Sequence, residues 1–124
     1  MRAAYCYGAA MVAVQGARFR KLATDTQKAW RHIPVLEVAN LRDALPFDCQ
    51  IVCVELTANA RPLVNFVHPE RAFYIFGPED GNVPEELTSR YTTIAAPTDH
   101  CMNLAATVNV IVAPTPDGGV ATLL

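Results

Sequence analysis

Two short polar loops carry the residue types that could bind a ligand. The first, Gly77-Pro78-Glu79-Asp80-Gly81, follows an apolar run at 73–76, and the second, Pro97-Thr98-Asp99-His100-Cys101, leads into a small-residue segment at 102–112. Glycine lets a backbone approach a ligand closely, and the free N–H groups at a helix start can hold an acceptor. The first loop matches neither the G-x-G-x-x-G pattern nor a phosphate loop, so an ordinary strand-to-helix turn is the alternative interpretation.

Cysteine and metal chemistry have little support in the sequence. Cys101 precedes the 102–112 segment, where a thiol pKa can fall, but no histidine is placed by a known pattern to act as its base. The cysteines Cys6, Cys49, Cys53 and Cys101 form no C-x-x-C pair, and the three histidines are isolated from one another. We therefore expect reduced, mostly buried thiols and no metal site.

A basic stretch with one aromatic residue is the candidate for nucleic-acid contact. Its basic residues are Arg18, Arg20, Lys21, Lys28 and Arg31. Such a stretch could follow a phosphate backbone while Trp30 stacks on a base. The alternative is a solvated face with Trp30 filling the core, and the core is where we expect Trp30.

The elements that must position these residues alternate between strand and helix. Apolar runs predict strands at 9–14, 35–38, 50–56, 73–76 and 92–96. Helical segments are expected at 2–7, 24–30, 40–46, 59–66, from Pro84 onward and at 102–112. This alternation predicts an α/β fold with a mostly parallel sheet and helices on both faces. Ligands then bind where neighbouring strands end, and Glu55 near such an end could accept a ribose hydroxyl.

Length and charge narrow the class of protein. The chain has 124 residues, of which 52% are hydrophobic, and a formal charge of −2. These values predict one domain with its own hydrophobic core. The nearly neutral charge permits nucleic-acid binding only through a local basic patch. We see no signal peptide and no apolar run that would span a membrane, so a cytoplasmic protein is expected. Prolines and glycines after 112 make residues 113–124 an atypical tail.

Two sequence motifs, which follow one another along the chain, resemble those of the TrmH/SpoU branch of the SPOUT RNA methyltransferases. They are Phe-Gly-Pro-Glu-Asp-Gly at 76–81 and Ala-Pro-Thr-Asp-His-Cys-Met-Asn-Leu-Ala-Ala-Thr-Val-Asn-Val at 96–110, and the segment 23–35 is also similar to bacterial members. The resemblance implies a C-terminal trefoil knot, which general topology rules would not suggest. It also implies S-adenosyl-L-methionine as cofactor, a homodimer with a shared active site, and methyl transfer to a ribose 2′-hydroxyl of RNA, tRNA being favoured over rRNA.

The resemblance also implies roles for individual residues. The predicted cofactor-binding residues are Leu56, Thr57, Gly77, Gly81, Ala96, Cys101 and Met102. The predicted catalytic residues are Arg2, Glu79 and Asn103, and the predicted RNA-binding residues are Arg2, Arg18, Arg20, Lys21 and Arg31. Because a guanidinium rarely loses its proton, we expect Arg2 to hold the target phosphate and stabilise the developing alkoxide.

Two other interpretations of the sequence stay open. The first motif of the family normally places an Asn and a Gly several residues before its arginine, and only Arg2 of that motif is matched here. A catalytically impaired relative that retains cofactor binding, RNA binding or dimerisation is therefore the main alternative. A small-ligand α/β regulatory domain is the third interpretation, and it rests on the predicted architecture alone.

Overall fold

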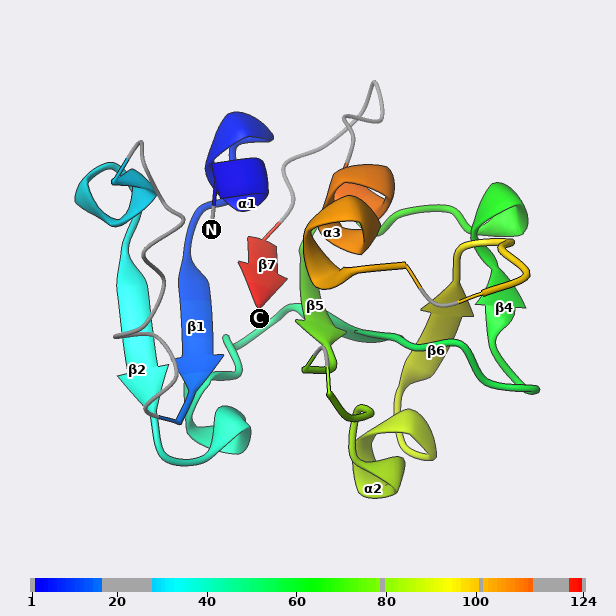
Figure 1. Cartoon of the computed structure of the whole chain (residues 1–124). Helices are drawn as coiled ribbons and strands as arrows, with labels where there is room; N and C mark the ends of the chain where they lie inside the picture. Colours follow the sequence, from blue (N-terminus) through cyan, green and yellow to red (C-terminus); the bar gives the residue numbers. More distant parts are fainter. Residues whose placement is uncertain (1, 17–27, 79, 101, 113–120, 124) are drawn as a thin grey trace.

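Helices or 3₁₀ turns separate most successive strands in the computed structural model (Figure 1), which describes residues 2–16, 28–78, 80–100, 102–112 and 121–123. The strands are β1 (Val12–Gln15), β2 (Val35–Val38), β3 (Gln50–Val54), β4 (Arg61–Pro62), β5 (Ala72–Phe76), β6 (Thr92–Ala95) and β7 (Ala121–Leu123). The helices are α1 (Arg2–Cys6), α2 (Glu85–Thr88) and α3 (Leu104–Val112), with 3₁₀ turns η2 (Ala29–Arg31), η3 (Leu41–Ala44) and η4 (Leu63–Asn65).

All the described strand pairs are parallel, as the alternation predicts. One sheet has the order β4-β6-β3-β5-β7, and β1 pairs with β2 in a second sheet. Strand β7 is hydrogen-bonded to β5 and also contacts β1, so it lies between the two sheets (Figure 1). The prediction of an α/β fold with parallel sheets is therefore confirmed.

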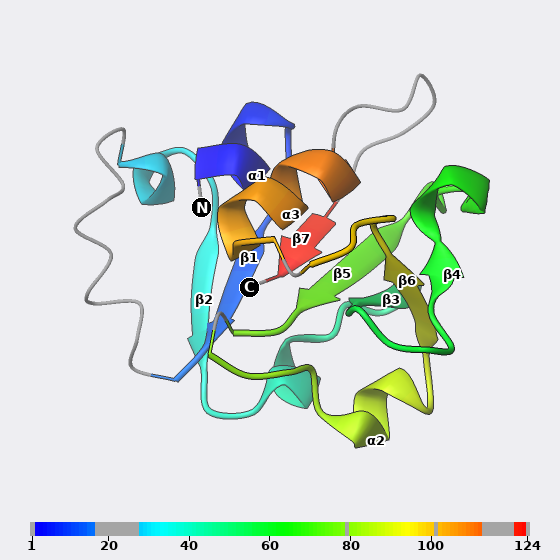
Figure 2. The same cartoon turned by 45° about the vertical axis from the view of Figure 1, so that its right-hand side comes forward.

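Helices cover both faces of the larger sheet, as the alternation of side chains along β5 shows. Tyr74 and Phe76 lie in one buried cluster together with residues of α3. Phe73 and Ile75 point the other way and lie in a second cluster, with residues of η3 and α2. Successive strand residues face opposite sides, so a strand covered on both faces must be apolar throughout. Figure 2 shows α1 and α3 on one side of the sheet and α2 on the other.

The predicted helix at 59–66 is wrong. Arg61 and Pro62 instead form the short edge strand β4, which pairs with Ile94 and Ala95 of β6, and only η4 follows. The residue before a proline is pushed away from the helical region, and Pro62 itself is extended with ψ of 133°. An edge strand tolerates proline because one side of it needs no hydrogen bonds.

The expectation that Trp30 fills the core is also wrong. Its side chain is 48% exposed, whereas its neighbour Ala29 is fully buried. The turn η2 follows Lys28, whose φ is 51°, and it directs the small Ala29 inward and the indole outward.

Burial of the cysteines is only partly confirmed: Cys53 is buried and Cys49 half-buried, but Cys6 is exposed, and Cys101 lies outside the described residues.

A buried tyrosine hydroxyl in β5 has a histidine partner. Tyr74 is fully buried, and its hydroxyl is hydrogen-bonded to Nδ1 of the half-buried His68. Burial lowers the pKa of His68 below its ordinary value and raises the pKa of Tyr74. Protonation of His68 is therefore easier in the unfolded chain than in the folded chain.

The lowered pKa of His68 makes stability depend on pH in a defined direction. The unfolded chain binds its proton as the pH falls through 6.5, the ordinary histidine value, while the folded chain still resists it. We expect the free energy of unfolding to fall over this window more steeply in the wild type than in His68→Gln. Urea denaturation at a series of pH values measures this difference, and parallel pH profiles for the two proteins would contradict it.

Candidate functional site

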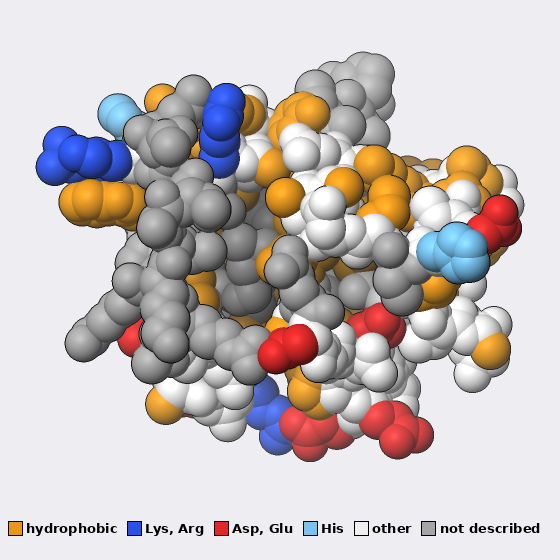
Figure 3. Space-filling model, viewed as in Figure 1, with side chains coloured by type: hydrophobic (Ala, Val, Ile, Leu, Met, Phe, Trp, Pro, Cys, Tyr) orange, Lys and Arg blue, Asp and Glu red, His pale blue; other side chains and the backbone are white. Residues whose placement is uncertain are grey.

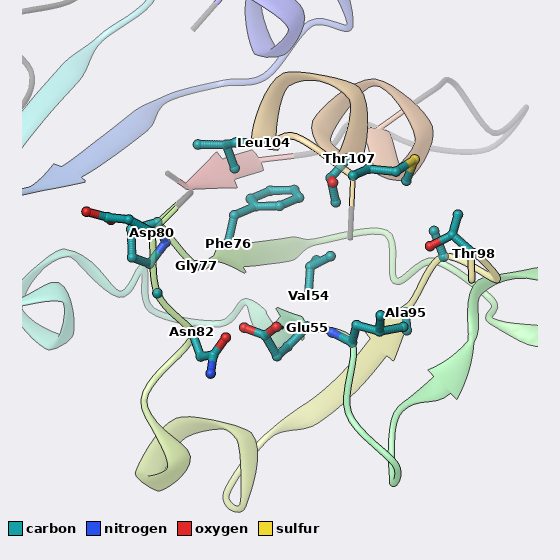
Figure 4. A pocket seen from close by; sticks show the side chains of 15 residues that line it. Val54, Glu55, Phe76, Gly77, Asp80, Asn82, Ala95, Thr98, Leu104 and Thr107 are labelled. Carbon is teal, nitrogen blue, oxygen red and sulfur yellow. Dashed lines mark hydrogen bonds between the residues drawn. The ribbon is translucent and has the colours of Figure 1, made fainter. Parts of the chain in front are cut away.

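A cavity of about 450 Å³ lies at the C-terminal ends of β3, β5 and β6 (Figure 4). Pockets for small organic ligands typically measure about 300–1,000 Å³, so this one is large enough for a cofactor. It is lined from β3 by Val54, Glu55 and Leu56, from the β5–α2 loop by Phe76, Gly77, Pro78, Asp80, Gly81 and Asn82, and from β6 to α3 by Ala95, Ala96, Thr98, Met102, Leu104 and Thr107.

The order of the strands explains why three loops meet here. The two polar loops of the sequence follow β5 and β6, but these strands are not neighbours, because β3 lies between them. The end of β3 therefore occupies the middle of the site and contributes Glu55 between the two loops. Figure 4 shows the Phe76 ring below Leu104 and Thr107 of α3, with Glu55 and Asn82 on the opposite side of the cavity.

Gly77 allows the β5–α2 loop to fold back tightly against β3. A Cβ atom at this position would lie 3.0 Å from the backbone N of Val83, 3.2 Å from the carbonyl carbon of Asn82 and 3.2 Å from Oε2 of Glu55. These atoms are closer than almost any side chain permits, and two of them belong to the backbone. Glycine at Gly77 therefore permits this close approach, and a side chain there would make the loop or Glu55 shift by a few tenths of an ångström.

Glu55 ties the three strand ends together. Its Oε2 accepts a hydrogen bond from the buried Val83 N–H at 2.8 Å, and its Oε1 accepts one from Leu56 N–H at 3.2 Å. Its own N–H donates to the carbonyl of Ile94 in β6 at 3.1 Å.

Burial, reinforced by the nearby Glu55 carboxylate, raises the pKa of the Cys53 thiol to about 11. That thiol is therefore not a nucleophile near neutral pH.

Asn103 caps the N-terminus of α3. Its Oδ1 accepts a hydrogen bond from Ala106 N–H at 2.8 Å, and its carbonyl accepts bonds from the N–H and the hydroxyl of Thr107, both at 3.0 Å. The adjacent Met102 and Leu104 line the cavity. The side chain predicted to be catalytic is therefore engaged in holding the helix that forms one wall of the site.

Removal of this cap should destabilise the protein measurably. We expect Asn103→Ala to lower the free energy of unfolding by about 0.5–2 kcal/mol, whereas Asn103→Asp keeps an acceptor and most of the stability. Urea denaturation of both variants measures the difference. Equal stability of Asn103→Ala and the wild type would show that the cap contributes nothing.

The structure brings most of the predicted cofactor-binding residues together. Leu56, Gly77, Gly81, Ala96 and Met102 line the cavity. Thr57 is outside the described lining, and its N–H bonds to the carbonyl of Glu55 at 3.1 Å. The predictions for Glu79, Cys101, Arg18, Arg20 and Lys21 fall outside the described residues.

The described basic residues predicted to contact RNA lie away from the cavity lining. Arg2 is exposed on α1, and Arg31 is exposed at the end of η2. Figure 3 shows Lys and Arg side chains gathered over α1 and η2, at the upper left of the view, and acidic side chains along the lower edge. Within one described chain, Arg2 is therefore not part of the cavity that the predicted cofactor-binding residues form.

Glu55 was expected to contact a ribose hydroxyl, but it was not among the predicted cofactor-binding or catalytic residues. Its position near a strand end was the only signal in the sequence, and its partner Val83 lies 28 positions further along the chain.

Within the described parts of the chain, no group of three or more His, Cys, Asp and Glu residues could hold a metal ion. In the same parts, every helix is too short or too polar to cross a membrane.

Comparisons with known proteins agree with this architecture. Residues 1–113 match the SpoU rRNA Methylase family, while no curated protein is matched. A solved structure from work on the 2-OH methylation of C/U34 on tRNA superimposes with a TM-score of 0.70 and 23% sequence identity, covering 90% of this chain and 75% of that one. That likeness supports the fold, and the family match covers both polar loops and α3. The chain belongs to the SpoU rRNA Methylase family.

Proposed function

We propose that this chain is an S-adenosyl-L-methionine-dependent RNA ribose 2′-O-methyltransferase that favours tRNA over rRNA. The observation that supports this most strongly is the cavity itself, since the loops that carry the second and third motifs of the family form its walls. The structural neighbour, which comes from work on tRNA methylation, supports the choice of tRNA. The proposal includes a single domain with the trefoil knot of SPOUT proteins.

The lining fits S-adenosyl-L-methionine in size and in chemistry. Apolar surface from Val54, Phe76 and Leu104 suits an adenine ring, and the close backbone at Gly77 suits hydrogen bonds to its edges. The predicted cofactor-binding residues would hold it mainly through backbone groups. Glu55 would accept a hydroxyl of its ribose, because the contact of Oε1 with Leu56 N–H is long at 3.2 Å and leaves acceptor capacity on the carboxylate. When bound, the cofactor supplies a methyl group already activated on a sulfonium.

The residues of this chain would then align the reaction and stabilise its charge. The cap made by Asn103 fixes the start of α3, and Glu79 would help to shape the β5–α2 loop. Arg2 would hold the RNA phosphate and stabilise the developing alkoxide. Because Arg2 lies outside the cavity lining, we propose that Arg2 of the partner subunit in a homodimer completes the site.

The position of Arg2 outside the cavity lining also favours one alternative function, in which the protein is a module that binds cofactor or RNA without catalysing methyl transfer. The two functions differ in what Arg2→Ala does. In the enzyme, this change abolishes methyl transfer while the affinity for the cofactor stays the same. In the binding module, wild type and variant are equally inactive and bind the cofactor equally well.

The direct test combines transfer and binding. Purified protein is incubated with bulk tRNA or rRNA and S-adenosyl-L-methionine carrying a labelled methyl group, and the modified ribose is identified after digestion. Calorimetry measures cofactor affinity on the same samples, and Arg90→Ala serves as a control for Arg2→Ala. Label in 2′-O-methylated nucleosides supports the proposal. Cofactor binding without transfer supports the binding module, and the absence of both would overturn the two together.

A further inference from the structure

An exposed cluster of aromatic and basic side chains lies where η2 meets α1. We call Tyr5, Trp30, Arg31 and His32 the aromatic–basic surface. The Arg31 guanidinium carbon lies 5.1 Å from the centroid of the Trp30 ring, and the rings of Tyr5 and His32 stack at 5.0 Å with an angle of 22°. Trp30 is 48% exposed and Tyr5 37% exposed, so large parts of both rings reach the surface.

The backbone presents these side chains outward. Ala29 and Ile33 point into the core, and the residues between them, Trp30 to His32, are all exposed. Isolated exposed apolar residues are common, but two stacked pairs side by side are a more specific arrangement. Exposed Trp, Tyr and Arg are also the residue types that binding surfaces favour.

The described segments that form the aromatic–basic surface carry basic residues and no acidic ones. Segments 2–8 and 28–34 contain Arg2, Lys28 and Arg31 and no Asp or Glu, although the whole chain carries a formal charge of −2. Most acidic side chains visible in Figure 3 lie in the lower half of the view, where basic side chains also lie. A basic patch on a weakly acidic protein attracts polyanions locally, and here it coincides with flat aromatic groups.

We propose that the aromatic–basic surface binds an unpaired segment of the RNA substrate, with a base stacked on Trp30 and phosphates held by Arg31 and Lys28. Every base has a face that an aromatic ring can stack on, and the adjacent cations neutralise the backbone. Paired RNA conceals its base faces, so the surface selects loops and ends over duplex. This inference rests on the proposed function for the choice of RNA as the partner.

The fluorescence of Trp30 tests the stacking directly, because it is the only tryptophan in the chain. Titration with a single-stranded oligouridylate should quench the emission at low salt, with weaker binding as salt increases. A matched RNA duplex and heparin are the comparison ligands. Quenching by the oligouridylate alone supports stacking, whereas oligouridylate binding that equals heparin binding and causes no quenching would overturn it.

Substitutions separate the aromatic–basic surface from general charge effects. Fluorescence anisotropy of a labelled single-stranded RNA should show about tenfold weaker binding for Trp30→Ala and for Arg31→Ala, and near-normal binding for Trp30→Phe. The matched control is Arg90→Ala, because Arg90 lies 5.5 Å from the ring centroid of Tyr91 in a similar pair next to α2. RNA affinity unchanged in both Trp30→Ala and Arg31→Ala, or reduced equally in the control, would overturn the inference.

Other outcomes distinguish this inference from the proposed function. If the wild type methylates RNA while Trp30→Ala binds it normally, the inference fails and the enzyme stands. If neither transfer nor cofactor binding occurs but oligouridylate still quenches Trp30, the surface stands without the enzyme. A blue shift of the emission with protein concentration alone, accompanied by dimerisation in sedimentation, would assign the surface to a second copy of the chain and overturn the inference.

Discussion

Replacement of Gly77 by alanine is expected to lower the affinity for S-adenosyl-L-methionine by about a hundredfold. The new Cβ would lie 3.0 Å from the Val83 nitrogen and 3.2 Å from Oε2 of Glu55, so it would push the β5–α2 loop away from β3. The shift would separate Val83 N–H from its acceptor at the same time. Calorimetric titration of wild type and Gly77→Ala with S-adenosylhomocysteine, which cannot be turned over, measures the loss.

The variant Gly81→Ala serves as the comparison for Gly77→Ala, because its added Cβ meets less obstruction. A Cβ at Gly81 would meet one close atom, the Cγ of the Pro78 ring at 3.2 Å, and no backbone atom. Because a ring can adjust where a backbone cannot, we expect its effect on affinity to be well below that of Gly77→Ala. Circular dichroism establishes that both variants are folded. Full affinity in a folded Gly77→Ala protein would mean that the cofactor does not use this loop.

Removal of the Glu55 carboxylate is the second change with a large expected effect. In Glu55→Ala, the buried Val83 N–H loses its acceptor, which we expect to cost about 1–3 kcal/mol of stability. The β5–α2 loop then loses its anchor on β3, and affinity for S-adenosylhomocysteine should fall about tenfold or more. Urea denaturation and calorimetry measure the two effects separately.

Glu55→Gln separates the anchoring of the loop from contact with the cofactor. The amide oxygen can still accept from Val83 N–H, but the amide nitrogen cannot accept a ribose hydroxyl. We therefore expect near-normal stability and a loss of preference for S-adenosylhomocysteine over its 2′,3′-dideoxy analogue. If the wild type binds the two ligands equally well, Glu55 only positions the loop and does not contact the ribose.

Much of the fold follows from local patterns in the sequence. The run Ala72–Phe76 is apolar at every position, which indicates a strand buried on both faces, and β5 is such a strand. Asn40 caps η3 by accepting from Arg42 N–H at 3.0 Å, within the helical segment expected at 40–46. In contrast, Pro62 overrides the helical pattern at 59–66, and the pairing of β7 with β5 depends on strand contacts far apart in sequence.

The sequence by itself determined β1, β2, β3, β5, β6 and the two polar loops, because these depend on apolar runs, turn residues and short motifs within a few positions. Strands β4 and β7 were not predicted. The sequence also determined the family, through motifs at 76–81 and 96–110. Only the tertiary structure decided that β3 lies between β5 and β6, which makes Glu55 the centre of the site. It also decided that Arg2 lies outside the cavity lining and that Trp30 faces the solvent. The physical reason is that these outcomes depend on strand order and on packing between distant segments, which no local pattern of residues encodes.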